Sequence, residues 1–189
     1  VDLAQEIGHQ SVINCPSDAR DIKRSRMKPF LILQLRPEPE ASDNEFAAIL
    51  EKSGLAEADT HRIQLNQEDL PAHLSLDDYS GVIVGGGPGC VSDAPEKKSD
   101  VEMRIETAIS GLMPEITARD YPFLGCCYGI GVLGHHLGKL VNKENYSEGP
   151  GSADCDLTDQ GNADQMLAGL PDNFRAFGGA QKAAPQAPE

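Results

Sequence analysis

Residues 121–137 read Tyr-Pro-Phe-Leu-Gly-Cys-Cys-Tyr-Gly-Ile-Gly-Val-Leu-Gly-His-His-Leu, and this stretch decides the fold. Its first four residues have the composition of a short buried strand, while apolar residues from Ile130 to Leu137 recur at helical spacing. Glycines flank the junction, where the chain has to turn sharply and neighbouring segments pass close to each other. The stretch therefore predicts a strand, a tight turn and a helix.

Further strands and helices are indicated on both sides of this stretch. Strand-like runs lie at residues 29–35, 62–65, 79–84 and 153–157. Helical patterns lie at residues 42–54, 101–116 and 163–167, the first with Ser42 or Asp43 as its N-cap and Gly54 at its end. The alternation of strands with helices predicts an α/β fold, in which helices cover both faces of a mostly parallel sheet.

The domain organisation expected from the sequence is simple. A chain of 189 residues can bury one sizeable core but hardly two. We expect a polar N-terminal extension at residues 1–26, one domain at residues 27–182 and a disordered tail rich in Ala and Pro at residues 183–189.

Charge and hydropathy exclude several classes of partner. The formal net charge is −14, from 16 Lys and Arg against 30 Asp and Glu. This charge would repel phosphate backbones and anionic lipids, so neither nucleic acid nor a membrane is expected as a partner. No run approaches the ~20 apolar residues that span a bilayer, and the N-terminus does not resemble a secretory signal. The sequence therefore predicts a cytoplasmic protein.

The cysteines predict free thiols. They are five in number and form no C-x-x-C pair, which argues against a disulfide framework and against a zinc site. Accordingly, no metal and no cofactor is expected.

Cys127 is the candidate nucleophile. It is the central residue of a G-x-C-x-G pattern at 125–129, the thiol form of a nucleophile elbow. A thiol at the start of a helix gains from the positive end of the helix dipole, which favours the reactive thiolate. Cys126 belongs to the strand side of the turn, so we expect its side chain to point into the core.

A second glycine-rich turn, Gly-Gly-Gly-Pro-Gly at residues 85–89, follows the strand predicted at 79–84. It lacks the Gly-Lys-Ser/Thr ending of a nucleotide-binding P-loop. If the two turns lie side by side at one edge of the sheet, backbone N–H groups of the first can face the thiol of the second. Such donors stabilise an oxyanion.

Together, residues 84–89 and 122–129 resemble the paired G-G-P-G and G-x-C-x-G motifs of class I glutamine amidotransferases. Within that family the chain is similar to stand-alone proteins that resemble the glutaminase half of GMP synthase, and the likeness covers residues 27–177. It implies a flavodoxin-like sheet of the amidotransferase type. It also implies an enzyme whose thiolate attacks the side-chain amide of glutamine, releases ammonia and leaves a glutamyl thioester for water to hydrolyse.

The resemblance also implies site residues and partners. It makes Cys127 the nucleophile and gives the oxyanion hole to the backbone N–H groups of Gly87 and Tyr128. Substrate contacts are expected at Gly86, Gly87 and Tyr128. Glutamine is the implied substrate, and a synthetase that receives the ammonia is the implied subunit or partner.

The sequence departs from the family pattern in three places. The family's late F-H-P-E type motif, which supplies a His and a Glu to the catalytic triad, has no counterpart after Cys127. Gly131 stands where the family often has a substrate-binding Gln, and segment 174–182 lacks a His that often follows Gly there. A C-terminal truncation or a lost reading frame near Gly179 would explain the pattern, and glutaminase activity is expected to be impaired.

Three alternatives to a glutaminase stay open at this point. The first is a non-catalytic, amidotransferase-like module that docks a synthetase. The second is a thiol protein of the chaperone and protease-like superfamily, although Tyr128 stands where such proteins usually have His. The third is a flavodoxin-like nucleotide binder. His9, His61, His73, His135 and His136 are all expected to be structural or surface residues.

Overall fold

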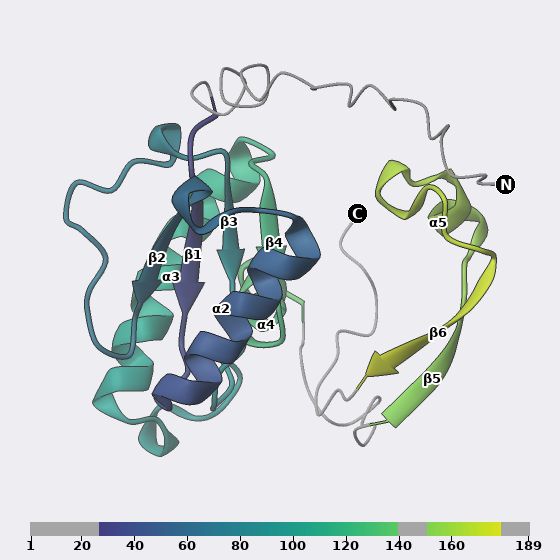
Figure 1. Cartoon of the computed structure of the whole chain (residues 1–189). Helices are drawn as coiled ribbons and strands as arrows, with labels where there is room; N and C mark the ends of the chain where they lie inside the picture. The colour runs from purple at the N-terminus through teal and green to yellow at the C-terminus, as the bar shows by residue number, and fades with distance from the viewer. Residues whose placement is uncertain (1–26, 140–150, 179–189) are drawn as a thin grey trace, which may run out of the picture.

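The computed structural model describes residues 27–139 and 151–178 (Figure 1). The sheet-forming part contains β1 (Phe30–Gln34), α2 (Pro39–Ser53), β2 (Thr60–Gln64), β3 (Gly81–Val84), α3 (Asp100–Ala118), β4 (Phe123–Gly125) and α4 (Tyr128–His136). The C-terminal part contains β5 (Gly151–Asp156), α5 (Asp159–Ala163) and β6 (Asn173–Gly178). Short 3-10 turns lie at Glu57–Asp59, Leu76–Asp78, Pro95–Lys97 and Gln165–Leu167.

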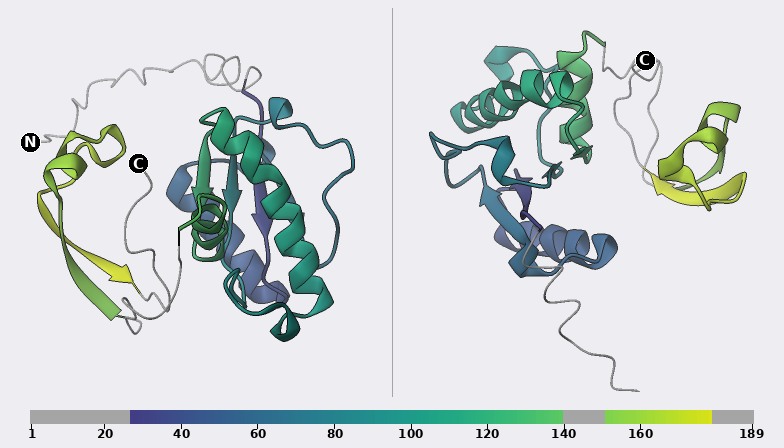
Figure 2. Two further views of the ribbon diagram at one scale, coloured as in Figure 1. Left: turned by 180° about the vertical axis from the view of Figure 1, so that it is seen from behind. Right: turned by 90° about the horizontal axis from the view of Figure 1, so that it is seen from above.

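The main sheet is parallel throughout, with strand order β2-β1-β3-β4. Helices α2 and α3 make the β1–β2 and β3–β4 connections, whereas the β2–β3 connection contains only the 3-10 turn at Leu76–Asp78; each is a long crossover, as parallel pairing requires. Helix α2 lies on one face of this sheet, and α3 and α4 lie on the other (Figures 1 and 2). The predicted α/β fold, with a mostly parallel sheet covered on both faces, is therefore confirmed.

Side chains of alternate strand residues build a core on each face. On the α2 face, Ile32 and Ile83 pack with Phe46. The larger core on the other face combines residues of β1 and β3 with the apolar stripe of α3 and the first turns of α4. Its fully buried members include Leu31, Leu33, Val84, Ile109, Met113 and Val132.

Helix α2 begins earlier than expected. Its N-cap is Glu38 and it starts at Pro39, whereas the sequence pattern pointed to Ser42 or Asp43. Proline is favoured at the first helical position because its fixed φ suits the helix and it has no N–H to leave unpaired. Ser42 instead lies buried in the first turn, where its hydroxyl accepts hydrogen bonds from Arg62 and Gln64. Gly54 ends the helix in the left-handed conformation, as predicted.

Helix α3 buries a shorter stripe than the sequence suggested. Val101 is exposed, and the buried positions start at Ile105. Val101 lies in the first turn of α3, one turn before the first buried position. Of the other predicted stripe positions, Ile105, Ile109 and Ile116 are buried, while Ala108 and Leu112 are half-buried.

The predicted strand at 153–157 is part of an antiparallel hairpin. β5 pairs with β6 from Gly151 opposite Gly178 to Asp156 opposite Asn173, in a two-stranded sheet of its own. The predicted helix at 163–167 is instead the short α5 followed by a 3-10 turn. None of residues 151–178 is buried, in contrast to β1 and β3.

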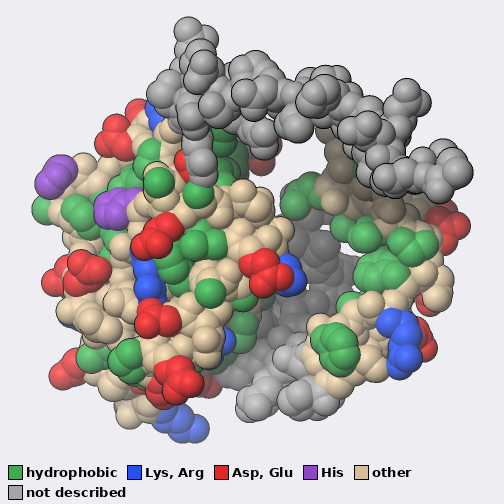
Figure 3. Space-filling model, in the orientation of Figure 1, with side chains coloured by type: hydrophobic (Ala, Val, Ile, Leu, Met, Phe, Trp, Pro, Cys, Tyr) green, Lys and Arg blue, Asp and Glu red, His purple; other side chains and the backbone are tan. Residues whose placement is uncertain are grey.

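The exterior of the sheet-forming part carries scattered charge. Acidic side chains are spread over its visible face and do not gather in one patch (Figure 3). In the two described ranges, no helix has the length and apolar character that crossing a bilayer demands. The extension expected at 1–26 and the tail expected at 183–189 lie outside the described residues, and the domain boundaries and cytoplasmic location stay predictions.

Candidate active site

The two glycine-rich turns leave neighbouring strands at the same edge of the sheet. In the β3–β4 ladder, Val84 is paired with Gly125, the last residue of β4. The ladder continues for one more hydrogen bond, from the backbone N–H of Cys126 to the carbonyl of Val84 at 2.8 Å. The segments that follow, the glycine loop (residues 85–89) and the elbow (residues 125–129), therefore start side by side.

Cys127 has the backbone conformation of a strained elbow. Its φ is 54° and its ψ is −93°, and it is the N-cap of α4. For a residue with a Cβ, positive φ costs about 1–3 kcal/mol and persists only where surrounding structure enforces it. The residue is exposed. The chain thus presents this side chain outward, at the start of a helix.

The elbow glycines are required because backbone segments approach them closely. A Cβ on Gly125 would lie 2.5 Å from the carbonyl carbon of Gly129 and 2.6 Å from the nitrogen of Ile130. A Cβ on Gly129 would lie 2.9 Å from the Cβ of Val84. These contacts explain the spacing of the G-x-C-x-G pattern, since any side chain at either end would force the turn open.

The glycine loop lies beside Cys127. The position that a Cβ of Gly86 would take is 3.5 Å from the Cβ of Cys127. Within the described ranges, no hydrogen bond is made by the backbone N–H of Gly87 or by that of Tyr128. Both groups are the oxyanion donors expected from the sequence, and neither has a hydrogen-bond partner among the described residues.

A charged network that the sequence reasoning missed borders the glycine loop. Oε1 of Glu45 accepts hydrogen bonds from the backbone N–H of Gly86 at 2.9 Å and from Nε of Arg36 at 3.1 Å. Oε2 of Glu45 accepts from Nε2 of Gln34 at 2.9 Å. The available signal was Gln34 itself, a polar residue inside an aliphatic strand, because a buried amide needs partners.

The side chain of Tyr128 anchors the start of α4 in the core. Its ring is buried in the core, and its hydroxyl donates to Glu106 at 3.4 Å. Glu106 also pairs with Lys98 at 2.6 Å. Burial, and then the negative charge of Glu106, raises the pKa of Tyr128 far above its ordinary value. Tyr128 therefore stays neutral.

The prediction for Cys126 is wrong. Its side chain was expected in the core, but the residue is exposed. Since β4 is the edge strand of the described sheet, this side of the elbow is not covered as an inner strand would be. Partial desolvation, followed by the negative charge of Glu45, raises the pKa of the Cys126 thiol. The Cys126 thiol is therefore less often in the reactive thiolate form at neutral pH than an ordinary thiol.

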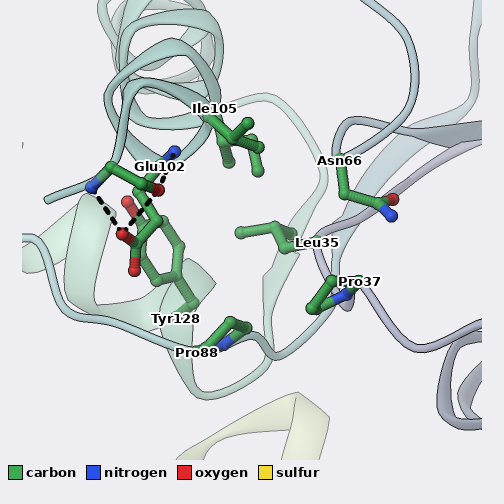
Figure 4. Close-up of a pocket in the computed structure, with 9 residues that line it drawn as sticks. Leu35, Pro37, Asn66, Pro88, Glu102, Ile105 and Tyr128 are labelled. Carbon is green, nitrogen blue, oxygen red and sulfur yellow. Dashed lines mark hydrogen bonds between the residues drawn. The ribbon is translucent and has the colours of Figure 1, made fainter.

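An apolar cavity of about 290 Å³ lies next to the glycine loop (Figure 4). Pro88, Tyr128 and Leu35 line it together with Ile105 and Glu102 of α3. Cys127 is not among the lining residues, so this cavity and the thiol are distinct features. Hydrogen bonds from the backbone and side chain of Ser99 lower the pKa of Glu102, which is therefore ionised beside the cavity.

The described histidines do not adjoin the thiol through hydrogen bonds. His135 and His136 are exposed in the last turn of α4, and Nε2 of His136 lies 3.1 Å from the hydroxyl of Thr117. His61 stacks on Tyr79. Within the described ranges, hydrogen bonds to sulfur involve Cys90 and Cys155 but not Cys127. His9 lies outside the described residues.

Comparison with known proteins identifies the family. The profile described as "Glutamine amidotransferase class-I" matches residues 42–178. The chain belongs to the class I glutamine amidotransferases. This assignment agrees with the family resemblance of the two glycine-rich motifs.

The amidotransferase relatives include bacterial GMP synthases. The chain is 33% identical over 120 residues to the GMP synthase [glutamine-hydrolyzing] of Lactobacillus gasseri, which covers 59% of this chain and 20% of that protein. It is 35% identical over 91 residues to that of Limosilactobacillus reuteri, which covers 48% of this chain and 14% of the relative. The chain thus spans no more than about a fifth of the length of these relatives.

Solved amidotransferase structures share the fold. A glutamine amidotransferase from Thermotoga maritima superposes with a TM-score of 0.61 at 19% identity, over 83% of this chain and 62% of that one. A glutamine amido transferase from Methylobacillus flagellatus gives a TM-score of 0.57 at 21% identity, over 84% and 57% of the two chains. At these identities the likeness concerns the fold alone.

Proposed function

We propose that this chain is a glutaminase that acts through Cys127 and supplies ammonia to a synthetase. The observation that carries the proposal is the strained, outward conformation of Cys127 at the start of α4, next to the glycine loop. A turn held in this conformation against its local preference is typical of a nucleophile.

The proposed chemistry uses the backbone around the thiol. The Cys127 thiolate attacks the side-chain carbonyl carbon of glutamine, and the carbonyl oxygen becomes an oxyanion. The N–H groups of Gly87 and Tyr128 donate to that oxyanion, and donors of this kind each contribute about 10²–10³ in rate. The C–N bond then breaks and the nitrogen leaves as ammonia after gaining a proton. Water hydrolyses the thioester to give glutamate and the free thiol.

Substrate contacts follow from the same arrangement. We assign the glutamine side chain to the space between Gly86, Gly87 and the first turn of α4 at Tyr128. Gly131 has no side chain to offer a bound glutamine, so backbone groups carry more of the binding here. No cofactor takes part in this scheme.

The proton steps are the slow part of this scheme. No His or carboxylate in the described ranges hydrogen-bonds the Cys127 thiol. A positioned general acid or base contributes about 10²–10⁴ to a step, so glutamine hydrolysis by this chain should be slower by that order than in an enzyme with a triad His.

That same observation favours a second candidate, a non-catalytic module that docks a synthetase. Such a module would keep the elbow as a structural element without using its thiol. The two candidates differ in whether Cys127 reacts with a glutamine-shaped electrophile.

Covalent labelling distinguishes them. A chloroketone analogue of glutamine should alkylate the full chain at Cys127, with one adduct by mass spectrometry and loss of chloride. Cys127→Ser should abolish the adduct, while the matched variant Cys126→Ser should retain it. Saturation of the rate by excess reagent, and protection by glutamine, would show a binding site. An intact, folded chain that takes no adduct at Cys127 would refute the glutaminase and leave the docking module.

A further inference from the structure

The carboxylate of Glu45 is held in one orientation by side chains from β1 and its continuation. The Glu45 side chain is 16% exposed, and Arg36 and Gln34 donate to its two oxygens. Gln34 is completely buried, and its Nε2 also donates to the carbonyl of Ser42 at 2.7 Å. A buried amide with this many partners has little freedom to turn, so the carboxylate is preorganised.

The Glu45 carboxylate is the hydrogen-bond acceptor of one N–H group in the glycine loop. The backbone N–H of Gly85 donates to the carbonyl of Leu33 at 2.9 Å, and that of Gly86 donates to Glu45 at 2.9 Å. Pro88 has no N–H. Gly87 is therefore the residue of the segment 85–88 whose N–H lacks a partner in the described ranges. Fixing the N–H of Gly86 toward α2 limits the orientation of the next peptide group.

The position of Glu45 is sterically matched to the loop. A Cβ on Gly85 would lie 2.5 Å from Oε2 of Glu45, and a Cβ on Gly86 would lie 2.9 Å from Nη2 of Arg36. The loop thus packs directly on this ion pair. The same Gly86 position is 3.5 Å from the Cβ of Cys127, so the pair lies next to the reacting group.

The charge of Arg36 is needed in this place. A carboxylate next to a developing oxyanion would oppose it, since like charges repel strongly where water is partly excluded. Arg36 offsets part of the charge of Glu45, with 3.1 Å from the guanidinium Nε to Oε1. The hydrogen bond to Gly86 is therefore retained with a smaller net negative charge beside the site.

We propose that Glu45 is a positioning residue for the glutaminase reaction: by binding the N–H of Gly86, it directs the N–H of Gly87 toward the oxyanion formed at Cys127. This inference rests on the proposed function. Glu45 does not touch the substrate, and it acts through the backbone of the glycine loop.

Two alkylating reagents test the proposal. When the Cys127 thiolate adds to the carbonyl of the chloroketone analogue of glutamine, an oxyanion forms before the sulfur displaces chloride from the neighbouring carbon and the carbonyl is restored. Iodoacetamide instead loses iodide by direct displacement, without an oxyanion. Glu45→Ala should slow chloroketone alkylation of Cys127 about 10- to 100-fold, less than or similar to losing a donor outright, and leave the iodoacetamide rate within about twofold. Glu45→Gln keeps an oxygen that can accept from Gly86, and should recover most of the chloroketone rate.

The control is Glu51→Ala, which removes an exposed carboxylate from the same helix and should change neither rate. Equal slowing of both reagents by Glu45→Ala, or no slowing of either, would overturn the proposal. If the unsubstituted chain takes no chloroketone at all, the proposed function fails first. Amide hydrogen exchange on the unsubstituted chain gives an independent check, because exchange at Gly86 should be slower than at Gly87. Equal exchange at the two amides would also overturn the proposal.

Discussion

The glycine loop and the elbow meet at one sheet edge but require glycine for different physical reasons. In the elbow, a Cβ on Gly125 would meet the backbone of Gly129 and Ile130. In the loop, added Cβ atoms on residues 85–87 would meet the side chains of Glu45, Arg36 and Leu35. The ends of Glu45 and Arg36 can move by a change of rotamer, although the Cβ of Leu35, which faces Gly87, cannot. The backbone of a helix start cannot move without losing hydrogen bonds. The elbow should therefore be the less tolerant of the two turns.

The largest expected effect is that of Gly125→Ala. The added methyl group would lie 2.5 Å from the carbonyl carbon of Gly129, a residue that itself lies close to Val84. We expect a loss of about 3 kcal/mol in the free energy of unfolding, at the upper end for an overpacked site. Urea denaturation followed by circular dichroism measures it. A loss below 1 kcal/mol would mean that the elbow backbone can shift to accept a methyl group. The elbow would then be no less tolerant of side chains than the glycine loop.

Gly85→Ala should have a smaller effect, since the atom it meets is Oε2 of Glu45 at 2.5 Å. We expect a loss of about 1–2 kcal/mol, because the carboxylate can move aside at the expense of its hydrogen bonds. The double variant Gly85→Ala/Glu45→Ala should be more stable than the sum of the single changes predicts. Urea denaturation of the two single variants and the double variant measures this. If the losses in free energy of unfolding are strictly additive, the added methyl group does not clash with Glu45.

Ser99→Ala tests the side chain that bounds the far end of the glycine loop. Ser99 caps α3 and donates to Glu102, whose Oε1 lies 2.6 Å from the Cβ position of Gly89. Loss of the cap should lower the free energy of unfolding by about 1 kcal/mol at neutral pH.

The effect of Ser99→Ala should also depend on pH. Because the pKa of Glu102 is lowered in the folded state, its contribution is present above the ordinary glutamate pKa and is lost as pH falls through the lowered value. The difference between Ser99→Ala and the unsubstituted chain should accordingly shrink in acid. A pH-independent difference in urea titrations would contradict this origin.

The smallest expected effect has the opposite sign. Gly131, in α4, has nothing within 4 Å of its Cβ position, and neither has Gly111 in α3. Alanine at a helix interior is favoured over glycine by about 0.8–1.0 kcal/mol, so Gly131→Ala should stabilise the chain by up to that amount. Gly111→Ala is the matched control. If thermal melting shows that Gly131→Ala destabilises the chain while Gly111→Ala does not, α4 has no room for a side chain at residue 131, as is the case for the elbow glycines.

Much of the fold could be predicted because short stretches of sequence determine its elements. The aliphatic runs that became β1 and β3, the glycine that ends α2 and the strand-turn-helix around Cys127 each follow from short-range rules. The family resemblance noted in the sequence likewise rested on two short motifs. The residue roles within the oxyanion hole and at the nucleophile stay predictions until labelling is done.

The failures have a common cause, which is that tertiary contacts decided the outcome. Ser42 reads as a cap, but its hydroxyl is used by Arg62 and Gln64 of a neighbouring strand. Cys126 reads as a core residue, but β4 is the edge of the described sheet. In the sequence, nothing distinguishes Glu45 from the other acidic residues of α2. Its contact with Gly86 joins residues 41 positions apart, and no local pattern reveals it.

The strand order has a consequence for how the thiol becomes reactive during folding. β3 and β4 are adjacent in the sheet, yet the whole of α3 lies between them in the chain, so their pairing closes a long loop before it gains any contact. Until that closure, residue 127 is an ordinary cysteine on an open chain. The alkylation rate of the Cys127 sulfur, followed during refolding, can therefore report when β3 and β4 pair.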